Sequence, residues 1–122
     1  MATRGSPSKT ELAYGQRLEM LRMAGELLSV EHQPEAIELP ADRCTFTADW
    51  RTVEPGGAVT FWEVKGAKKA ARGKTAPHYF DGEARLKAKL AARALSLMTP
   101  PARLVVVWPG PHGGWESKQV KP

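Results

Sequence analysis

The sequence has one cysteine, few aromatic residues and no long apolar run. Cys44 is the only cysteine among 122 residues. An internal disulfide therefore cannot form, which excludes the small secreted domains that disulfides hold together and indicates a reducing compartment. No apolar run approaches the roughly 18–20 residues that a membrane span requires, and the opening MATRGSPSKTE has no apolar stretch behind its arginine. We therefore expect no signal peptide, no membrane partner and a cytoplasmic location.

The remaining composition is that of an ordinary globular protein. Apolar residues make up 42% of the chain and charged residues 25%, which excludes a disordered or collagen-like chain. This length predicts one domain, which we place at 8–122 after a disordered segment 1–7. Eighteen Lys and Arg residues against 13 Asp and Glu residues give a formal charge of +5. That excess suits a polyanionic partner and is also common in metabolic enzymes, so composition alone leaves the function open.

Two segments have the pattern of helices. Ser8 and Glu11 have the spacing of a capping box, and apolar residues follow them at a helical period, which predicts a helix over about 9–24. A second helix is predicted from about 79 or 81 to 97. Its apolar stripe, which we expect to face the core, consists of Leu86, Leu90, Ala94 and Leu97.

The other segments predict strands and loops. Two short extended pieces are predicted within 27–40, on either side of Gln33-Pro34, followed by strands at 44–53, 58–66, 103–108 and 115–120. The basic segment 67–77 is rich in small residues and predicts a mobile loop. The order α-β-β-β-β-α-β-β indicates a single domain of the α+β or mixed α/β class.

The strands at 44–53 and 58–66 flank a Glu-Pro-Gly-Gly turn and are expected to form a hairpin. With the turn centred near Gly56, Asp49 faces Glu63 and Trp50 faces Trp62 across the antiparallel pair. Side chains alternate between faces, so these two pairs lie on opposite faces. The apolar face is predicted to hold Phe46, Ala48, Trp50, Trp62 and Val64, and the polar face Thr47, Asp49, Arg51, Phe61, Glu63 and Lys65.

The facing carboxylates of Asp49 and Glu63 are the main chemical signal in the chain. Like charges directly opposite each other destabilise a sheet by a few tenths to about 1 kcal/mol. Lys65 can offset part of this repulsion, and a divalent cation can offset more. Carboxylate oxygens suit Mg²⁺ or Mn²⁺. The alternative interpretation is a solvated face of mixed charge, with no site.

At these residues the sequence resembles the PD-(D/E)xK nuclease superfamily. Ala48-Asp49 stands at the Pro-Asp position, Glu63-Val64-Lys65 at the (D/E)xK element and Glu11 at the acidic position of the first helix. The chain is also similar, over about 8–108, to small phage-encoded nuclease-like proteins. That similarity rests on Ser8–Glu11, Gln33-Pro34, Glu63–Gly66 and Arg85–Arg93. The resemblance implies a restriction-endonuclease-like domain, with a central mixed sheet flanked by helices.

The resemblance also implies an activity and roles for these residues. It implies a Mg²⁺-dependent endodeoxyribonuclease, with Mn²⁺ as a substitute, acting in the host cytoplasm. Asp49 and Glu63 would bind the metal ion, with the Val64 carbonyl as a further ligand. Lys65 would orient the attacking water or stabilise charge on the phosphorus. Glu11 would be a further metal ligand, and its alternative role is only that of a helix cap.

Basic residues follow the Glu-x-Lys element in two groups. Lys68, Lys69, Arg72 and Lys74 belong to the predicted loop, and Arg85, Lys87, Lys89 and Arg93 belong to the second predicted helix. Beside a metal site they are candidates for phosphate contacts, and otherwise they form a solvated cationic face. The spacing of Asp49, Glu63 and Lys65 is similar to that of a phage Holliday-junction resolvase, which is a dimer. We therefore expect duplex or branched DNA as substrate and a homodimer.

Two other functions stay open at this point. A non-catalytic nucleic-acid-binding phage protein would keep the fold without activity, and an accessory phage protein would lack DNA affinity. His32, His78 and His112 are scattered along the chain and are interpreted as surface or turn residues.

Overall fold

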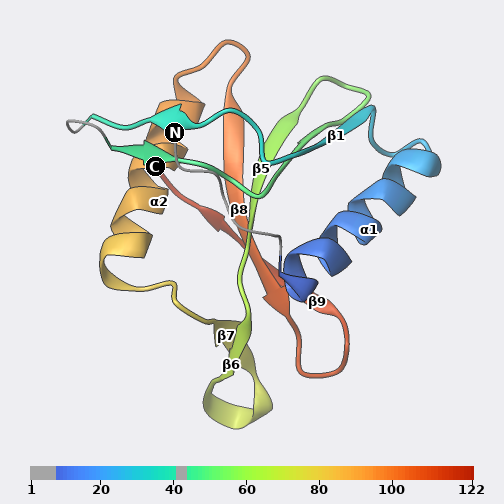
Figure 1. The fold of residues 1–122 in the computed structure, drawn as a ribbon, viewed down its shortest axis with the longest axis vertical. Coiled ribbons are helices and arrows are strands. Elements are labelled where there is room, and N and C mark those ends of the chain that lie inside the picture. The colour runs from blue at the N-terminus through green and yellow to red at the C-terminus, as the bar shows by residue number, and fades with distance from the viewer. Residues whose placement is uncertain (1–7, 41–43) are drawn as a thin grey trace.

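The structure is a computed structural model that describes residues 8–40 and 44–122; the segment predicted to be disordered, 1–7, lies outside them. It confirms the α+β class: a five-stranded mixed sheet lies between two helices (Figure 1). In chain order the elements are α1 (Lys9–Met23), β1 (Ser29–His32), β2 (Ile37–Glu38), β3 (Thr45–Phe46), β4 (Trp50–Val53), β5 (Val59–Val64), β6 (Ala67–Lys69), the 3₁₀ turn η1 (Ala71–Gly73), β7 (Thr75–Pro77), α2 (Gly82–Ser96), β8 (Ala102–Pro109) and β9 (Trp115–Val120).

The first helix begins where its capping signal predicts. The hydroxyl of Ser8 accepts a hydrogen bond from the Glu11 amide at 3.1 Å, which satisfies one of the amides left without a partner at a helix start. Tyr14 and Leu18 are buried on the face toward the sheet. Gly15, also on that face, packs directly beneath the indole ring of Trp50.

The main sheet has the order β1-β4-β5-β8-β9. All neighbours are antiparallel except β5 and β8, which are parallel, and α2 lies in the connection between them. The predicted hairpin register is confirmed for β4 and β5, since Trp50 pairs with Trp62 and Val53 with Val59. The long β-prone run 44–53 nevertheless forms two strands, because β3 leaves the main sheet and pairs with β2.

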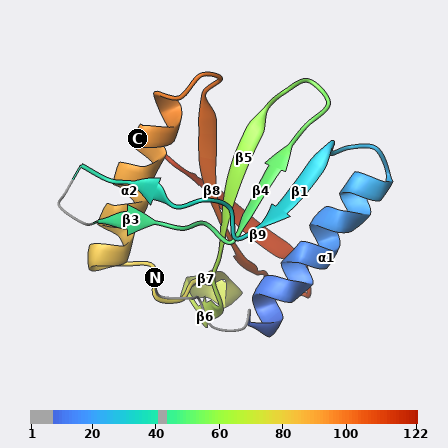
Figure 2. The same ribbon diagram turned by 45° about the horizontal axis from the view of Figure 1, so that its top comes forward.

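Each face of the sheet is covered by one helix (Figure 2). The α1 face packs Tyr14, Leu18, Leu27, Val105 and Val107 with Trp50, Trp62 and Val64. The α2 face packs Ala88, Ala91, Ala92 and Leu95 with Phe61, Leu104, Ala48 and the β2–β3 pair. The predicted layer of Phe46 and Ala48 beside Trp50 is therefore wrong. The break between β3 and β4 ends the strict alternation of side chains and turns those two residues to the opposite face.

The predicted buried stripe of α2 is confirmed only for Leu90 and Ala94, which pack against the core. Leu86 and Leu97 are 58% and 77% exposed, whereas Ala88, Ala91 and Leu95 are fully buried. Alanines have little side chain to keep the helix away from the sheet, so α2 packs closely against β8. A prediction from hydrophobic periodicity selects leucines as the buried residues. It contains no information on how closely the helix packs against the sheet.

Segment 67–77 forms a short hairpin rather than the predicted mobile loop. Lys68 pairs with Ala76 and Lys69 with Thr75. At the tip, Arg72 and Gly73 have positive φ angles of 60° and 71°. The β6–β7 hairpin projects beyond the end of the main sheet (Figure 1), and Thr75 Oγ1 donates a 2.9 Å hydrogen bond to the Pro109 carbonyl.

Neither α1 nor α2, the two α-helices of the described chain, is long and apolar enough to cross a membrane.

Candidate active site

Asp49 is buried at the point where β4 begins, and only 2% of it is exposed. Its amide donates to the Trp62 carbonyl at 2.9 Å, although Trp62 is also the partner of Trp50 in the sheet register. Two residues therefore face one, which is the arrangement of a β-bulge. The predicted cross-strand pair of Asp49 with Glu63 is accordingly wrong, because the ladder shifts by one residue before it reaches them.

The Asp49 side chain nevertheless contacts the Glu-x-Lys element. Its Oδ2 atom accepts a hydrogen bond from the Val64 amide at 2.7 Å. Hydrogen bonds to an ionised carboxylate are stronger than those between neutral groups. The bulge therefore directs the Asp49 carboxylate to the central residue of Glu63-Val64-Lys65.

Glu63 and Lys65 lie at the carboxyl end of β5. Lys65 Nζ is 3.5 Å from Glu63 Oε2, and the two side chains are 23% and 13% exposed. The Lys65 amide donates to the Val107 carbonyl at 2.9 Å, which ties this end of β5 to β8. The Lys65 ammonium group thus partly offsets the negative charge of the Glu63 carboxylate, as predicted from its position two residues after Glu63.

Glu11 approaches from the first turn of α1 and is 7% exposed. Its Oε2 atom lies 2.6 Å from Nε2 of His32, and its carbonyl accepts a 3.2 Å hydrogen bond from the Trp50 indole. The His32 ring packs on Trp50 with centroids 4.3 Å apart. Glu11 is therefore fixed at both its main chain and its side chain.

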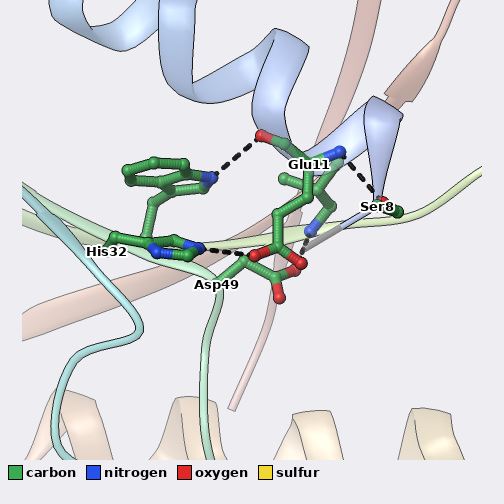
Figure 3. Close-up of polar contacts among 6 residues, drawn as sticks. Ser8, Glu11, His32 and Asp49 are labelled. Carbon is green, nitrogen blue, oxygen red and sulfur yellow. Dashed lines mark hydrogen bonds and ion pairs between the residues drawn. The ribbon is translucent and has the colours of Figure 1, made fainter. Parts of the chain in front are cut away.

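The carboxylates of Glu11 and Asp49 point toward one another (Figure 3). The first comes from α1 and the second from the start of β4, and each is held by its own partner, His32 or the Val64 amide. The structure thus brings the predicted Glu11 and Asp49 together next to the end of β5, where Glu63 and Lys65 lie.

The donor chemistry of this site fits Mg²⁺, but the site is not a ready-made metal cage. Within 8–40 and 44–122, no group of three or more His, Cys, Asp and Glu side chains is placed to hold a metal ion. Mg²⁺ usually takes one or two carboxylates, keeps several waters and completes its shell with substrate phosphates, so it does not need such a group. The residues that would hold it are Asp49 and Glu63, with Glu11 and the Val64 carbonyl beside them.

The predicted basic residues separate into three places. Lys69, Arg72 and Lys74 are exposed on the projecting β6–β7 hairpin. Lys68 at the base of the hairpin and Arg85 and Lys89 on α2 line a common groove. Lys87 and Arg93 of α2 lie outside that groove.

His32 is the site residue that sequence reasoning missed. Its place before Gln33-Pro34 indicates a surface or turn residue, yet its ring joins Glu11 to Trp50. His32 and Glu11 are 21 positions apart in the sequence, so no local spacing could link them. The only nearby signal is the Gln-Pro element itself.

Comparisons of the chain with protein-family models, with curated proteins and with solved structures find no match.

Proposed function

We propose that this protein is a Mg²⁺-dependent endodeoxyribonuclease of the PD-(D/E)xK type. The observation that carries the proposal is the 2.7 Å hydrogen bond from the Val64 amide to Asp49, which joins the acidic residue to the Glu63-Val64-Lys65 element. The order of elements supports it as well: a helix that carries Glu11, a hairpin, a second helix and a parallel strand. These elements and residues are the ones that the resemblance implies.

In this proposal Asp49, Glu63 and Lys65 have separate roles in the hydrolysis of the phosphodiester bond. A Mg²⁺ ion held by Asp49 and Glu63 would supply a positive charge that polarises the scissile phosphate and lowers the pKa of a water molecule. Asp49 and Glu63 supply its carboxylate ligands, and the Val64 amide keeps Asp49 in place. Lys65, positioned by Glu63 at 3.5 Å, orients the attacking water or offsets charge that develops on the phosphate.

The substrate in this proposal is duplex or branched DNA, including Holliday junctions. The exposed cations of the β6–β7 hairpin support it, because phosphate contacts position DNA without reading its sequence. A homodimer belongs to the proposal, since one domain of this size covers only part of a branched substrate.

The test is cleavage of linear, nicked, flapped and four-way-junction DNA with Mg²⁺ or Mn²⁺. We expect Asp49→Asn and Glu63→Gln each to lose metal-dependent cleavage while circular dichroism shows an unchanged fold. Glu116→Gln is the matched control, because Glu116 is an exposed acid on β9, and it should cleave like the parent chain. Metal-dependent cleavage retained by both site variants would refute the assignment.

A non-catalytic nucleic-acid-binding protein with the same fold is the second candidate. The exposed cations of the β6–β7 hairpin, Lys69, Arg72 and Lys74, support it, because phosphate contacts require no metal ion. It predicts DNA binding in a gel shift with no cleavage in any metal ion. An accessory phage protein would show neither property.

A further inference from the structure

A groove of about 720 Å³ lies on the α2 face of the sheet, between β7, α2, β8 and β9. Its charge is strongly one-sided. Among the described residues that line the groove, Asp81 is the only acidic one, whereas five are cationic: Lys68, Arg85, Lys89, Lys118 and Lys121. Lys118 and Lys121 come from the C-terminal strand region and are not among the predicted DNA contacts.

The groove also has aromatic walls. Phe80, which precedes α2, and Trp108 of β8 both line it. A cationic groove with aromatic side chains is the combination that proteins use for single-stranded nucleic acid, because the cations follow the phosphates while unpaired bases stack on the rings. In a duplex the bases are already paired and stacked, so these rings would have no base face to meet.

The groove and Glu63 lie on the same face of the main sheet. Glu63 pairs with Val106 of β8, and Val106 pairs with Lys118 of β9. Directly paired residues share one face of a sheet, so Glu63 lies on the same face as the groove wall formed by Val106 and Lys118. Two strand spacings, about 10 Å, separate the backbones of Glu63 and Lys118.

We infer that this groove binds a single-stranded segment of DNA and leads it toward Glu63 and Lys65. The direction in which the groove leads the DNA rests on the proposed nuclease function, and the inference also narrows the substrate of that nuclease. It names the substrate as DNA with a single-stranded segment, such as a flap or a strand end, beside a duplex. The projecting hairpin, with Lys69, Arg72 and Lys74 fully outside the groove, then contacts the duplex part.

The experiment measures binding without cleavage, so that it stands apart from the test of activity. Fluorescence anisotropy follows a labelled eight-residue oligothymidylate with the full chain in EDTA, over a series of salt concentrations. Two competitors are used: a blunt duplex with the same number of phosphates, and heparin. We expect the oligothymidylate to bind more tightly than the duplex.

Three variants separate the contributions to binding. Lys118→Ala combined with Lys121→Ala should make the slope of log Kobs against log salt shallower by about 1.4, or 0.7 for each phosphate that is no longer neutralised. Phe80→Leu should weaken binding by up to about 5- to 150-fold with little change in slope, because stacking releases no counterions. The matched control, Lys87→Ala combined with Arg93→Ala, removes two cations of α2 outside the groove and should change neither value.

The outcomes are distinct. Equal reductions in affinity for the groove and control variants, or tighter binding to the duplex or to heparin, would overturn the inference, as would no binding of the oligothymidylate. If the groove variants behave as expected and no metal ion supports cleavage, the groove assignment stands and the proposed nuclease fails.

Discussion

Nε2 of His32 lies 2.6 Å from Oε2 of Glu11, and this contact links the end of β1 to the first turn of α1. Glu11 has two separate environments. Its amide donates to the Ser8 hydroxyl of the helix cap, while its carboxylate faces His32 and points toward Asp49 (Figure 3). The helix cap and the site therefore use different atoms of Glu11, and one role does not exclude the other.

Replacing His32 should weaken the proposed activity by changing the position of Glu11. Groups that hold a metal ligand in place contribute about 10- to 100-fold in metal affinity or activity. We expect His32→Ala to raise the Mg²⁺ concentration needed for half-maximal cleavage by that factor, and His32→Gln, which retains a side-chain nitrogen, to restore part of it. His112→Ala, in an exposed turn, is the control. An unchanged Mg²⁺ titration for His32→Ala would show that His32 has no positioning role.

Replacing Gly15 with alanine should destabilise the protein. A Cβ atom at this position would lie 2.1 Å from Cζ2 of Trp50, well inside contact distance. Overpacking costs about 1–3 kcal/mol and at times more, and alanine returns roughly 1 kcal/mol of helix propensity. We expect a net decrease of up to about 2 kcal/mol in the free energy of unfolding, measured in urea. Gln16→Ala, on the exposed side of α1, should stay within about 0.5 kcal/mol of the parent.

Stability should fall at high pH because of Tyr14. Burial raises the pKa of Tyr14 from 10.0 to about 12, and the Arg17 charge and hydrogen bond oppose this only in part. Between pH 10 and 12 the unfolded chain has released the phenol proton while the folded chain keeps it, so rising pH favours unfolding. Two pKa units correspond to about 2–3 kcal/mol. Urea unfolding at pH 9 to 12 should show this decrease in the parent, and Tyr14→Phe should lack that component.

The exposed cations of the β6–β7 hairpin should contribute to duplex binding through charge alone. Changing Lys69, Arg72 and Lys74 together to alanine should make the salt dependence of duplex affinity shallower by about 1 for each cation that neutralises a phosphate. Affinity should fall to a similar degree for different duplex sequences, because binding to phosphates carries no sequence information. Titrations of two unrelated duplexes at several salt concentrations measure both quantities. A decrease confined to one duplex would contradict binding to the DNA backbone.

Local signals predicted the parts of the fold that depend on neighbouring residues. The Ser8 cap located the start of α1, and the Glu-Pro-Gly-Gly turn fixed the register that pairs Trp50 with Trp62. The proximity of Asp49 to Glu63-Val64-Lys65 was also predicted, although the contact is a hydrogen bond from the Val64 amide and not the expected pairing with Glu63. The bulge at Asp49 shifts the pairing of the two strands by one residue, and no glycine, proline or other turn residue in the sequence marks its position.

The parts that the sequence could not predict depend on distant packing. The close approach of α2 through Ala88 and Ala91 depends on the sheet beneath it, so a leucine stripe was an incomplete guide. The contact of His32 with Glu11 requires β1 to lie beside β4, where His32 pairs with Trp50. Lys118 likewise joins the groove only because β9 is placed next to β8.

The parallel pairing of β5 with β8 also has a consequence for how the chain folds. The pair joins segments 43 residues apart, as the hydrogen bond from Arg103 to Thr60 illustrates, whereas β4 and β5 are joined by one tight turn. Closing a long loop costs chain entropy before its contacts form, and such non-local pairings slow folding. We therefore expect the β4–β5 hairpin and α2 to form early and the closure of β5 on β8 to limit the rate, so that the slowest step of folding also completes the surroundings of Lys65.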